Sequence, residues 1–283
     1  MVDAILVGTS KNPKALINRF ENGFKTFKLN YNINNKGNIT FLGCDYDQNI
    51  SPREFKNILA NIIADIIVED WAQILIKRII RDHYYYFNEE EKKNIREKAL
   101  ELLNTEGFSY KPLIRKNSIV QRVIEYLERH QEIVLEGFVN FRLKDYLLEI
   151  EDIVDAAVDD FLLEKEYLEF IRLLRYFVEI QEPKVNEVHI LFEKDNAFKL
   201  VDRHGKLIEN EYMDGFSIEL MNSSINYEDL LISALITLAP RLVVMHLTDA
   251  NEPKDTIKTI DNVFGKKAKQ CTGCNLCTKK KET

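Results

Sequence analysis

The residues best suited to chemistry lie near the C-terminus, where three of the four cysteines fall within seven residues. Cys271, Cys274 and Cys277 follow the pattern Cys-x-x-Cys-x-x-Cys. Gaps of two residues let a loop fold back so that successive sulfurs face one centre, and Gly273 permits a positive φ in that loop. The spacing therefore predicts that the three sulfurs bind a metal ion or an iron–sulfur cluster.

The pattern leaves the identity of the ion open. It matches the first three ligands of a bacterial ferredoxin run, but the fourth cysteine and the following proline of that run are missing. A zinc ion would need a fourth ligand, for which Cys44 and His246 are the candidates. An iron–sulfur cluster would keep one open or exogenous position. Zinc and an iron–sulfur cluster are thus both candidate cofactors.

Two other interpretations of the cysteine triad stay open. Lysines flank it on both sides, and positive charge lowers the pKa of a thiol, which favours the reactive thiolate near neutral pH. The triad could then do thiol redox chemistry without a metal, or it could lie in a disordered basic tail that binds nothing. The flanking lysines are Lys266, Lys267, Lys269, Lys279, Lys280 and Lys281.

Among the five histidines, His246 is the one expected near the triad. It lies in the apolar run LVVMHL, close in sequence to the cysteines, although such a histidine is more often a hydrogen-bonded core or strand-end residue. The others are expected elsewhere: His189 pointing outward from a strand, His204 in a turn, and His83 and His130 near helix ends.

The longest regular element expected is a helix, or two abutting helices, over residues 142–182. This segment contains no Gly or Pro, and its apolar residues recur at helical spacing. It carries twelve acidic and five basic residues, a local charge of 5 − 12 = −7 that equals the charge of the whole chain. One face should lie in the core and an acidic face in water.

The acidic face of this helix could bind divalent ions or do acid–base work. Asp152, Asp155 and Asp159 are the candidates, but no Glu-x-x-His partner accompanies them, as a di-iron bundle would require. A solvated face, or a face that receives a basic protein partner, is the favoured interpretation.

Two runs in and before this helix resemble a known family. The runs GFVNFRLKDYL, at 137–147, and AAVDDFLLEKEYLEFIRLLRYFVEIQEP, at 156–183, are similar to the YtxC-like family, bacterial proteins named for sporulation. The resemblance extends to the cysteine-bearing C-terminus, and over the first hundred residues it holds only in general layout. It implies a sporulation context and supplies no catalytic residue.

Composition narrows the possible classes of protein. A chain of 283 residues with 45% hydrophobic residues can bury a substantial core in one large or two ordinary domains. The net charge of −7 argues against a general affinity for nucleic acid or anionic membranes. Basic and aromatic residues at 77–87 could form a single-strand RNA surface, but packing at a helix end is the favoured interpretation.

The sequence predicts a cytoplasmic protein. The N-terminus lacks the basic and apolar pattern of a signal peptide. The most hydrophobic window, 58–80, is interrupted by five charged residues that a membrane-spanning helix would not tolerate. Cysteines in a reducing compartment are not expected to form structural disulfides.

The expected architecture is α+β and mostly helical. A β-α-β-β segment covers 1–50, a helical region 51–182, an α/β region 183–265 and a Lys/Cys-rich tail 266–283. We expect the N-terminal strands to join the C-terminal ones in one mixed sheet, with the helical region as a large insertion. The near-continuous apolar strand at 242–247 lies between two predicted helices, which favours a parallel pairing.

Capping signals place several helices. Ser51 and Asn88, each followed three residues later by Glu, predict helices over 52–85, bent or broken near Asp70, and over 88–104. A further helix is expected to begin at Asn117 or Ser118. After Pro183 the pattern predicts a meander with strands near 188–192, 198–201 and 216–220. Helices are then capped by Asn226 and by Asn251, and the second ends at Gly265.

No catalytic motif is present in the sequence. It lacks G-x-G-x-x-G, a Walker loop, H-E-x-x-H and G-x-S-x-G, and the loop at 8–11 is a weak signal for phosphate binding. We therefore expect a non-catalytic binding or regulatory component with a protein partner and a three-cysteine metal site. The alternatives are an iron–sulfur or zinc-dependent redox protein or enzyme that uses the triad, and a nucleic-acid binder that uses the lysine-rich tail.

Overall fold

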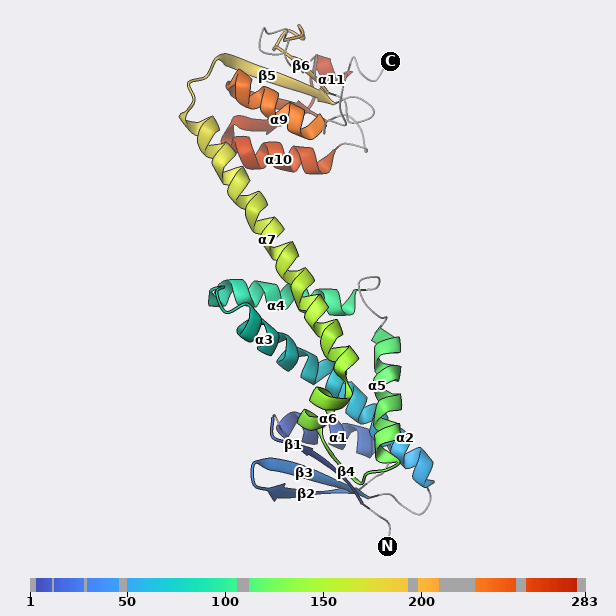
Figure 1. Ribbon diagram of the computed structural model, residues 1–283. Helices are drawn as coiled ribbons and strands as arrows, with labels where there is room; N and C mark the ends of the chain where they lie inside the picture. The colour runs from blue at the N-terminus through green and yellow to red at the C-terminus, as the bar shows by residue number, and fades with distance from the viewer. Residues whose placement is uncertain are drawn as a thin grey trace. The chain divides into compact units, whose positions relative to one another are not determined.

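The chain divides into two compact units. The computed structural model describes residues 4–11, 13–27, 30–45, 50–105, 112–192, 198–208, 227–247 and 253–278. The first unit is Met1–Leu163 and the second is Glu164–Thr283, so the boundary falls inside the helix α7 (Lys144–Ile180) (Figure 1). Each unit has a hydrophobic core of its own.

The first unit contains a four-stranded mixed sheet with the strand order β2-β3-β1-β4. Its strands are β1 (Ile5–Thr9), β2 (Asn30–Lys36), β3 (Ile39–Asp45) and β4 (Glu132–Val134). β2 and β3 form the predicted hairpin, which turns at Gly37 with a φ of 61°. β1 pairs antiparallel with β3 and parallel with β4.

The helices of this unit begin largely where the capping signals predict. They are α1 (Pro13–Phe27), α2 (Pro52–Asp65), the π-helical segment η1 (Ile66–Trp71), α3 (Ala72–His83), α4 (Glu89–Asn104), α5 (Pro112–Leu127), α6 (Leu135–Arg142) and the start of α7. The Ser51 side chain accepts from the Glu54 amide at 3.2 Å, and Asn88 with Glu91 forms a complete capping box. The predicted irregularity near Asp70 is the π-helical segment η1, a local widening between two α-helical stretches.

Two expectations about this unit are wrong. The N-terminal strands do not join the C-terminal sheet, because the three-residue strand β4 occupies the edge of β1 inside the first unit. The helix expected from Asn117 or Ser118 begins at Pro112 instead, since proline suits the first helical turn, where its missing N–H costs no hydrogen bond.

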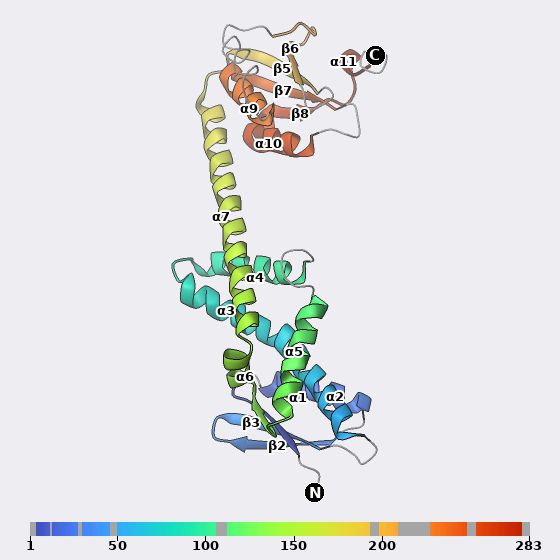
Figure 2. The same cartoon turned by 45° about the vertical axis from the view of Figure 1, so that its right-hand side comes forward.

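The second unit contains another four-stranded mixed sheet, with the order β6-β5-β7-β8 (Figure 2). Its strands are β5 (Val185–Phe192), β6 (Phe198–Val201), β7 (Pro240–His246) and β8 (Ala268–Gln270). β7 pairs parallel with both β5 and β8, which confirms the predicted parallel pairing. The helical elements are α9 (Tyr227–Leu238), α10 (Lys254–Phe264), the 3₁₀ turn η3 (Gly265–Lys267) and α11 (Asn275–Thr278).

The two faces of this sheet have different surroundings. Val188, Ile190, Val243 and Met245 are fully buried and belong to the core that α9, α10 and the end of α7 supply. Successive side chains of a strand alternate between faces, so His246 and its neighbours two residues apart lie on the opposite face. That opposite face carries the candidate site.

The expected fold class, a mostly helical α+β chain, is confirmed, with two mixed sheets where one was expected. None of the helices in the described ranges is long and apolar enough to span a membrane. The strand expected at 216–220 and the caps expected at Asn226 and Asn251 lie outside the described residues.

Candidate metal centre

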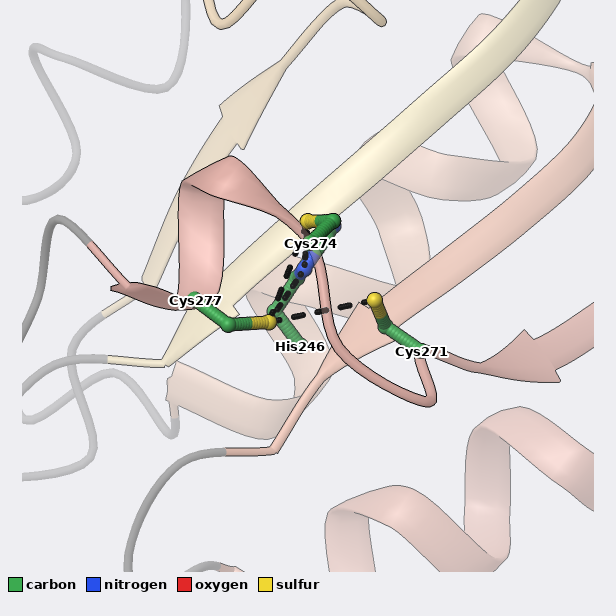
Figure 3. Close-up of side chains that lie close together, drawn as sticks. All are labelled: His246, Cys271, Cys274 and Cys277. Carbon is green, nitrogen blue, oxygen red and sulfur yellow. Dashed lines mark hydrogen bonds between the residues drawn. The ribbon is translucent and has the colours of Figure 1, made fainter.

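Four side chains with metal-binding atoms converge at the carboxyl ends of β7 and β8 (Figure 3). They are His246, Cys271, Cys274 and Cys277, and their ligand atoms all lie within 4.8 Å of one another. His246 Nδ1 lies 3.2 Å from Cys277 Sγ and 3.6 Å from Cys274 Sγ. Cys277 Sγ lies 3.9 Å from Cys274 Sγ and 3.8 Å from Cys271 Sγ.

The parallel pairing of β7 with β8 brings these residues together. His246 is the last residue of β7, and Cys271 directly follows β8, so both lie where the carboxyl ends of two neighbouring strands meet. The Cys271 amide continues the pairing by donating to the Met245 carbonyl at 2.8 Å. The chain then turns at Gly273, whose φ of 129° suits glycine, and brings Cys274 and Cys277 back toward His246.

Backbone groups stabilise charge on the sulfurs. Burial acts to raise the pKa of Cys274, but hydrogen bonds from the Cys277 and Leu276 backbone and from the neighbouring thiols outweigh it, so this pKa is lowered. The Gly273 amide lies 3.4 Å from Cys271 Sγ and donates to it. Burial raises the pKa of Cys277 to about 11. Cys274 therefore ionises more readily than Cys277, and a bound cation would favour loss of the remaining thiol protons.

Among the described residues, the groups that lower the pKa of Cys274 are not the flanking lysines. Positive charge on the flanking lysines was expected to lower the thiol pKa values, whereas backbone amides and neighbouring thiols lower that of Cys274. Lys267 is engaged elsewhere, because its ammonium donates to the Val178 carbonyl at 2.7 Å. Lys279–Lys281 lie outside the described residues.

His246 is buried, with 1% of its surface exposed, and both its ring nitrogens have neighbours. Nδ1 faces the sulfurs, and Nε2 lies 2.7 Å from His189 Nδ1. His189 Nε2 in turn lies 3.3 Å from a carboxylate oxygen of Glu187. His189 points away from the core of the unit, as its alternation along the strand predicts, but its side chain is only 12% exposed because it faces His246.

Cys44, the other candidate for the fourth ligand, lies in the core of the first unit. It is fully buried, and its sulfur lies 3.7 Å from the Leu42 carbonyl oxygen. Burial strongly raises its pKa, which keeps it a neutral thiol. Of the two candidates, His246 is the one that the structure brings to the cysteine triad.

The other candidate sites have structural roles. Tyr84 donates to Asp155, and the buried Phe87 packs edge-to-face on Phe161, so this part of the aromatic run at 83–87 packs against α7. In the loop at 9–11, the amide donors meet the Glu136 carboxylate. Over the described ranges, the His/Cys cluster is the one group of three or more such side chains placed to hold a metal ion.

Comparison with known proteins places the chain in a family. The family model that describes the YtxC-like family matches residues 57–269, well over half of the 283 residues. The chain belongs to the YtxC-like family. The match begins within the helical region, earlier than the resemblance suggests, and it ends two residues before Cys271. Glu187, His189 and His246 lie within the YtxC-like match, and the three cysteines lie just beyond it.

A curated relative supports the same assignment. The chain is 29% identical over 192 residues to a protein named "Uncharacterized protein YtxC" from Bacillus subtilis (strain 168). The alignment covers 66% of this chain and 66% of the relative, just under two thirds of each. No solved structure matches the chain.

Sequence reasoning identified the triad and named His246, but it missed Glu187 and His189. The missed signal was the spacing along β5, where both residues occupy the same face of a strand paired in parallel with β7. That signal becomes readable only once the β5–β7 register is known, because the sequence by itself does not say which strands are neighbours.

Proposed function

We propose that the C-terminal unit of this YtxC-like protein binds one zinc ion through His246, Cys271, Cys274 and Cys277. The ion would fix the cysteine-bearing segment to the carboxyl end of β7. The protein as a whole would act as a non-catalytic binding or regulatory component.

The observation that carries this proposal is the set of distances among the four ligand atoms. Tetrahedral zinc, with Zn–S bonds of about 2.3 Å and Zn–N bonds of about 2.0 Å, implies S···S distances of about 3.8 Å and N···S distances of about 3.5 Å. Two of the three sulfur pairs lie at 3.8 and 3.9 Å, and two of the three nitrogen–sulfur pairs at 3.2 and 3.6 Å. Four of the six distances among the ligand atoms thus match those of a tetrahedron around a single ion, and the other two are no longer than 4.8 Å.

The same distances argue against a four-iron cluster. In such a cluster each cysteine binds a different iron, so the sulfurs are spread around a body that is several ångströms wide. A single tetrahedral iron ion would fit the observed spacing, and elemental analysis distinguishes it from zinc.

The ligand set also favours a structural role for the ion. Three cysteines and one histidine fill all four positions of tetrahedral zinc and leave no position for water or substrate. Catalytic zinc sites keep one position open. A closed site therefore supports a role in folding or partner binding rather than in catalysis.

The biological setting is an inference from the family. The YtxC-like resemblance supports a role in sporulating bacteria, and four free cysteines fit a reducing cytoplasm. The acidic face of α7, with residues such as Asp152 and Asp159, supports a basic protein partner.

Elemental analysis of the purified full-length protein tests the proposal. We expect one zinc per chain in the wild type and a loss of most of it in the variants Cys274→Ser and His246→Ala. Cys44→Ser is the matched control, because it removes a cysteine of the other core, and it should keep its zinc. Stoichiometric iron with visible absorbance would show that the site binds iron and not zinc. A metal-free wild type that takes up no added zinc would refute the proposal.

A further inference from the structure

We propose that Glu187 and His189 are positioning residues of the metal centre. Together they hold His246 in the one tautomer that presents Nδ1 to the ion, a role that rests on the proposed zinc site. They reach the ion through His246 and are not themselves ligands.

The strand register places the three residues in a row. β5 and β7 are parallel with His189 opposite Val244 and Leu191 opposite His246, so the two histidines share a face and are offset by two residues. Their ring centroids lie 5.0 Å apart and their planes differ by 25°, so the rings meet nearly edge to edge, as a hydrogen bond between their nitrogens requires. Glu187 lies two residues before His189 on the same face of β5.

The distances define a chain from the carboxylate to the sulfurs. Glu187 Oε1 lies 3.3 Å from His189 Nε2, and His189 Nδ1 lies 2.7 Å from His246 Nε2. On the other side of the ring, His246 Nδ1 lies 3.2 Å from Cys277 Sγ. The contact from Glu187 to the buried His189 Nε2 is out of hydrogen-bond alignment, so we expect the part-exposed carboxylate to rotate into line with that N–H.

Hydrogen-bond chemistry then selects one arrangement of protons. A neutral imidazole has one donor and one acceptor nitrogen, whereas an ionised carboxylate only accepts. Glu187 therefore favours the proton of His189 on Nε2, which leaves His189 Nδ1 as an acceptor for the Nε2 proton of His246. His246 Nδ1 keeps its lone pair, and this is the nitrogen that faces the sulfurs.

The opposite arrangement is unfavourable at both ends. If His189 donated from Nδ1, its unprotonated Nε2 would face the Glu187 carboxylate, and two acceptors would lie 3.3 Å apart. His246 would then carry its proton on Nδ1, where a ligand needs a lone pair. Partners of this kind orient metal-bound histidines, and their removal usually weakens metal binding by about 10–100-fold.

Three variants test the role of this chain by the zinc affinity of the full-length protein, measured by competition with a chromophoric chelator. His189→Phe keeps an aromatic ring but removes the acceptor, so we expect zinc affinity to fall by about 10–100-fold. His189→Gln restores an oxygen acceptor and should recover most of that loss. Glu187→Ala should lower affinity less than His189→Phe, because it removes the selection of the tautomer and leaves the acceptor.

A spectroscopic readout separates positioning from general packing. In the zinc-loaded wild type, ¹⁵N–¹H correlations through the His246 ring should place the ion on Nδ1 and the proton on Nε2. In His189→Phe, the Nε2–H signal should lose its hydrogen-bonded shift. His204→Phe is the matched control, because it changes an exposed histidine of the same unit, and it should alter neither affinity nor the His246 spectrum.

The outcomes distinguish this inference from the proposed function. If the wild type binds zinc and Cys274→Ser does not, but His189→Phe and Glu187→Ala keep wild-type affinity or His246 binds through Nε2, the positioning role is refuted and the zinc site stands. If the wild type binds no zinc, both fail. Should His189→Phe fail to fold, Glu187→Ala and the wild-type spectrum still decide.

Discussion

At the scale of single residues, the four cysteines are chemically unequal because their surroundings differ. Cys44 is fully buried in an apolar core, and burial strongly raises its pKa. The three cysteines near the C-terminus are partly exposed, and hydrogen bonds lower the pKa of Cys274. A thiolate reacts with alkylating reagents far faster than a thiol, so accessibility and pKa act in the same direction.

We predict that iodoacetamide modifies three thiols of the folded, reduced and metal-free protein and leaves Cys44 unmodified. Cys274 should react before Cys277, since burial raises the pKa of Cys277 to about 11. Mass spectrometry of the modified peptides over time measures both rates. Added zinc should protect the three reactive thiols by occupying their sulfurs.

Two controls define this prediction. Cys44→Ser should leave the number of modified thiols unchanged in the folded protein, and unfolding in guanidinium should expose the fourth thiol of the wild type. Modification of Cys44 as fast as Cys271 in the folded state would contradict the prediction, since it would show that the first core opens readily.

Residue spacing revealed only part of the centre in advance. The Cys-x-x-Cys-x-x-Cys pattern is local, so its geometry follows from two-residue gaps and Gly273. His246 and His189 depend on strands that are distant in the sequence, and their alternation along a strand fits a core residue as well as a ligand. The spacing of the three cysteines was therefore predictable from the sequence, whereas the positions of the two histidines relative to them were not.

At the scale of elements, the loop between β1 and α1 is held by a carboxylate from α6. Thr9 Oγ1 and the amides of Ser10 and Lys11 donate to Glu136 Oε1 at 2.7, 2.8 and 2.9 Å, and Ser10 Oγ lies 3.1 Å away. The donors that gave the weak phosphate signal are thus occupied within the protein. Glu136 ties the end of β1 to the helix that follows β4.

We predict that Glu136→Ala lowers the stability of the first unit by about 2–3 kcal/mol, because it leaves several donors without their charged acceptor. Glu136→Gln keeps an oxygen acceptor and should cost less. Thermal unfolding followed by circular dichroism measures the loss, expected as a shift of roughly 5–10 °C. The exposed Glu128→Ala is the control of equal size, and an equal effect of the two alanine variants would contradict the role of Glu136.

Element boundaries were predictable where a capping residue marks them. Ser51 and Asn88 begin their helices as expected because the cap is a local hydrogen bond. The three-residue strands β4 and β8 carry no periodic signal and exist only through pairing with β1 and β7. Both strands were missed, although β8 is the element that delivers Cys271 to His246.

At the scale of the whole molecule, the expectation of a single sheet failed for the same reason. Strand patterns identify strands and not their partners, and pairing is decided by packing between distant segments. The edge of β1 is filled by β4 within the first unit, and the C-terminal strands build a separate sheet around β7. We therefore expect a change in the contacts of one core to alter the stability of that unit and not of the other.

Trp71 makes this separation measurable. It is the one tryptophan of the chain and lies 2% exposed in the core of the first unit, so its fluorescence reports on that unit. The proposed zinc site lies in the second unit. An ion at 1,000 times its dissociation constant stabilises the state that binds it by about 4 kcal/mol.

We predict that removing zinc with a chelator lowers one unfolding midpoint, seen by circular dichroism, and leaves the midpoint of Trp71 fluorescence unchanged. Glu136→Ala should do the reverse, shifting the fluorescence midpoint while the zinc-dependent transition stays in place. Each perturbation is the control for the other, because each acts on one core only. If the chelator moved both midpoints together, the two cores would unfold as one cooperative unit, and stabilisation by zinc would have to reach Trp71 as well.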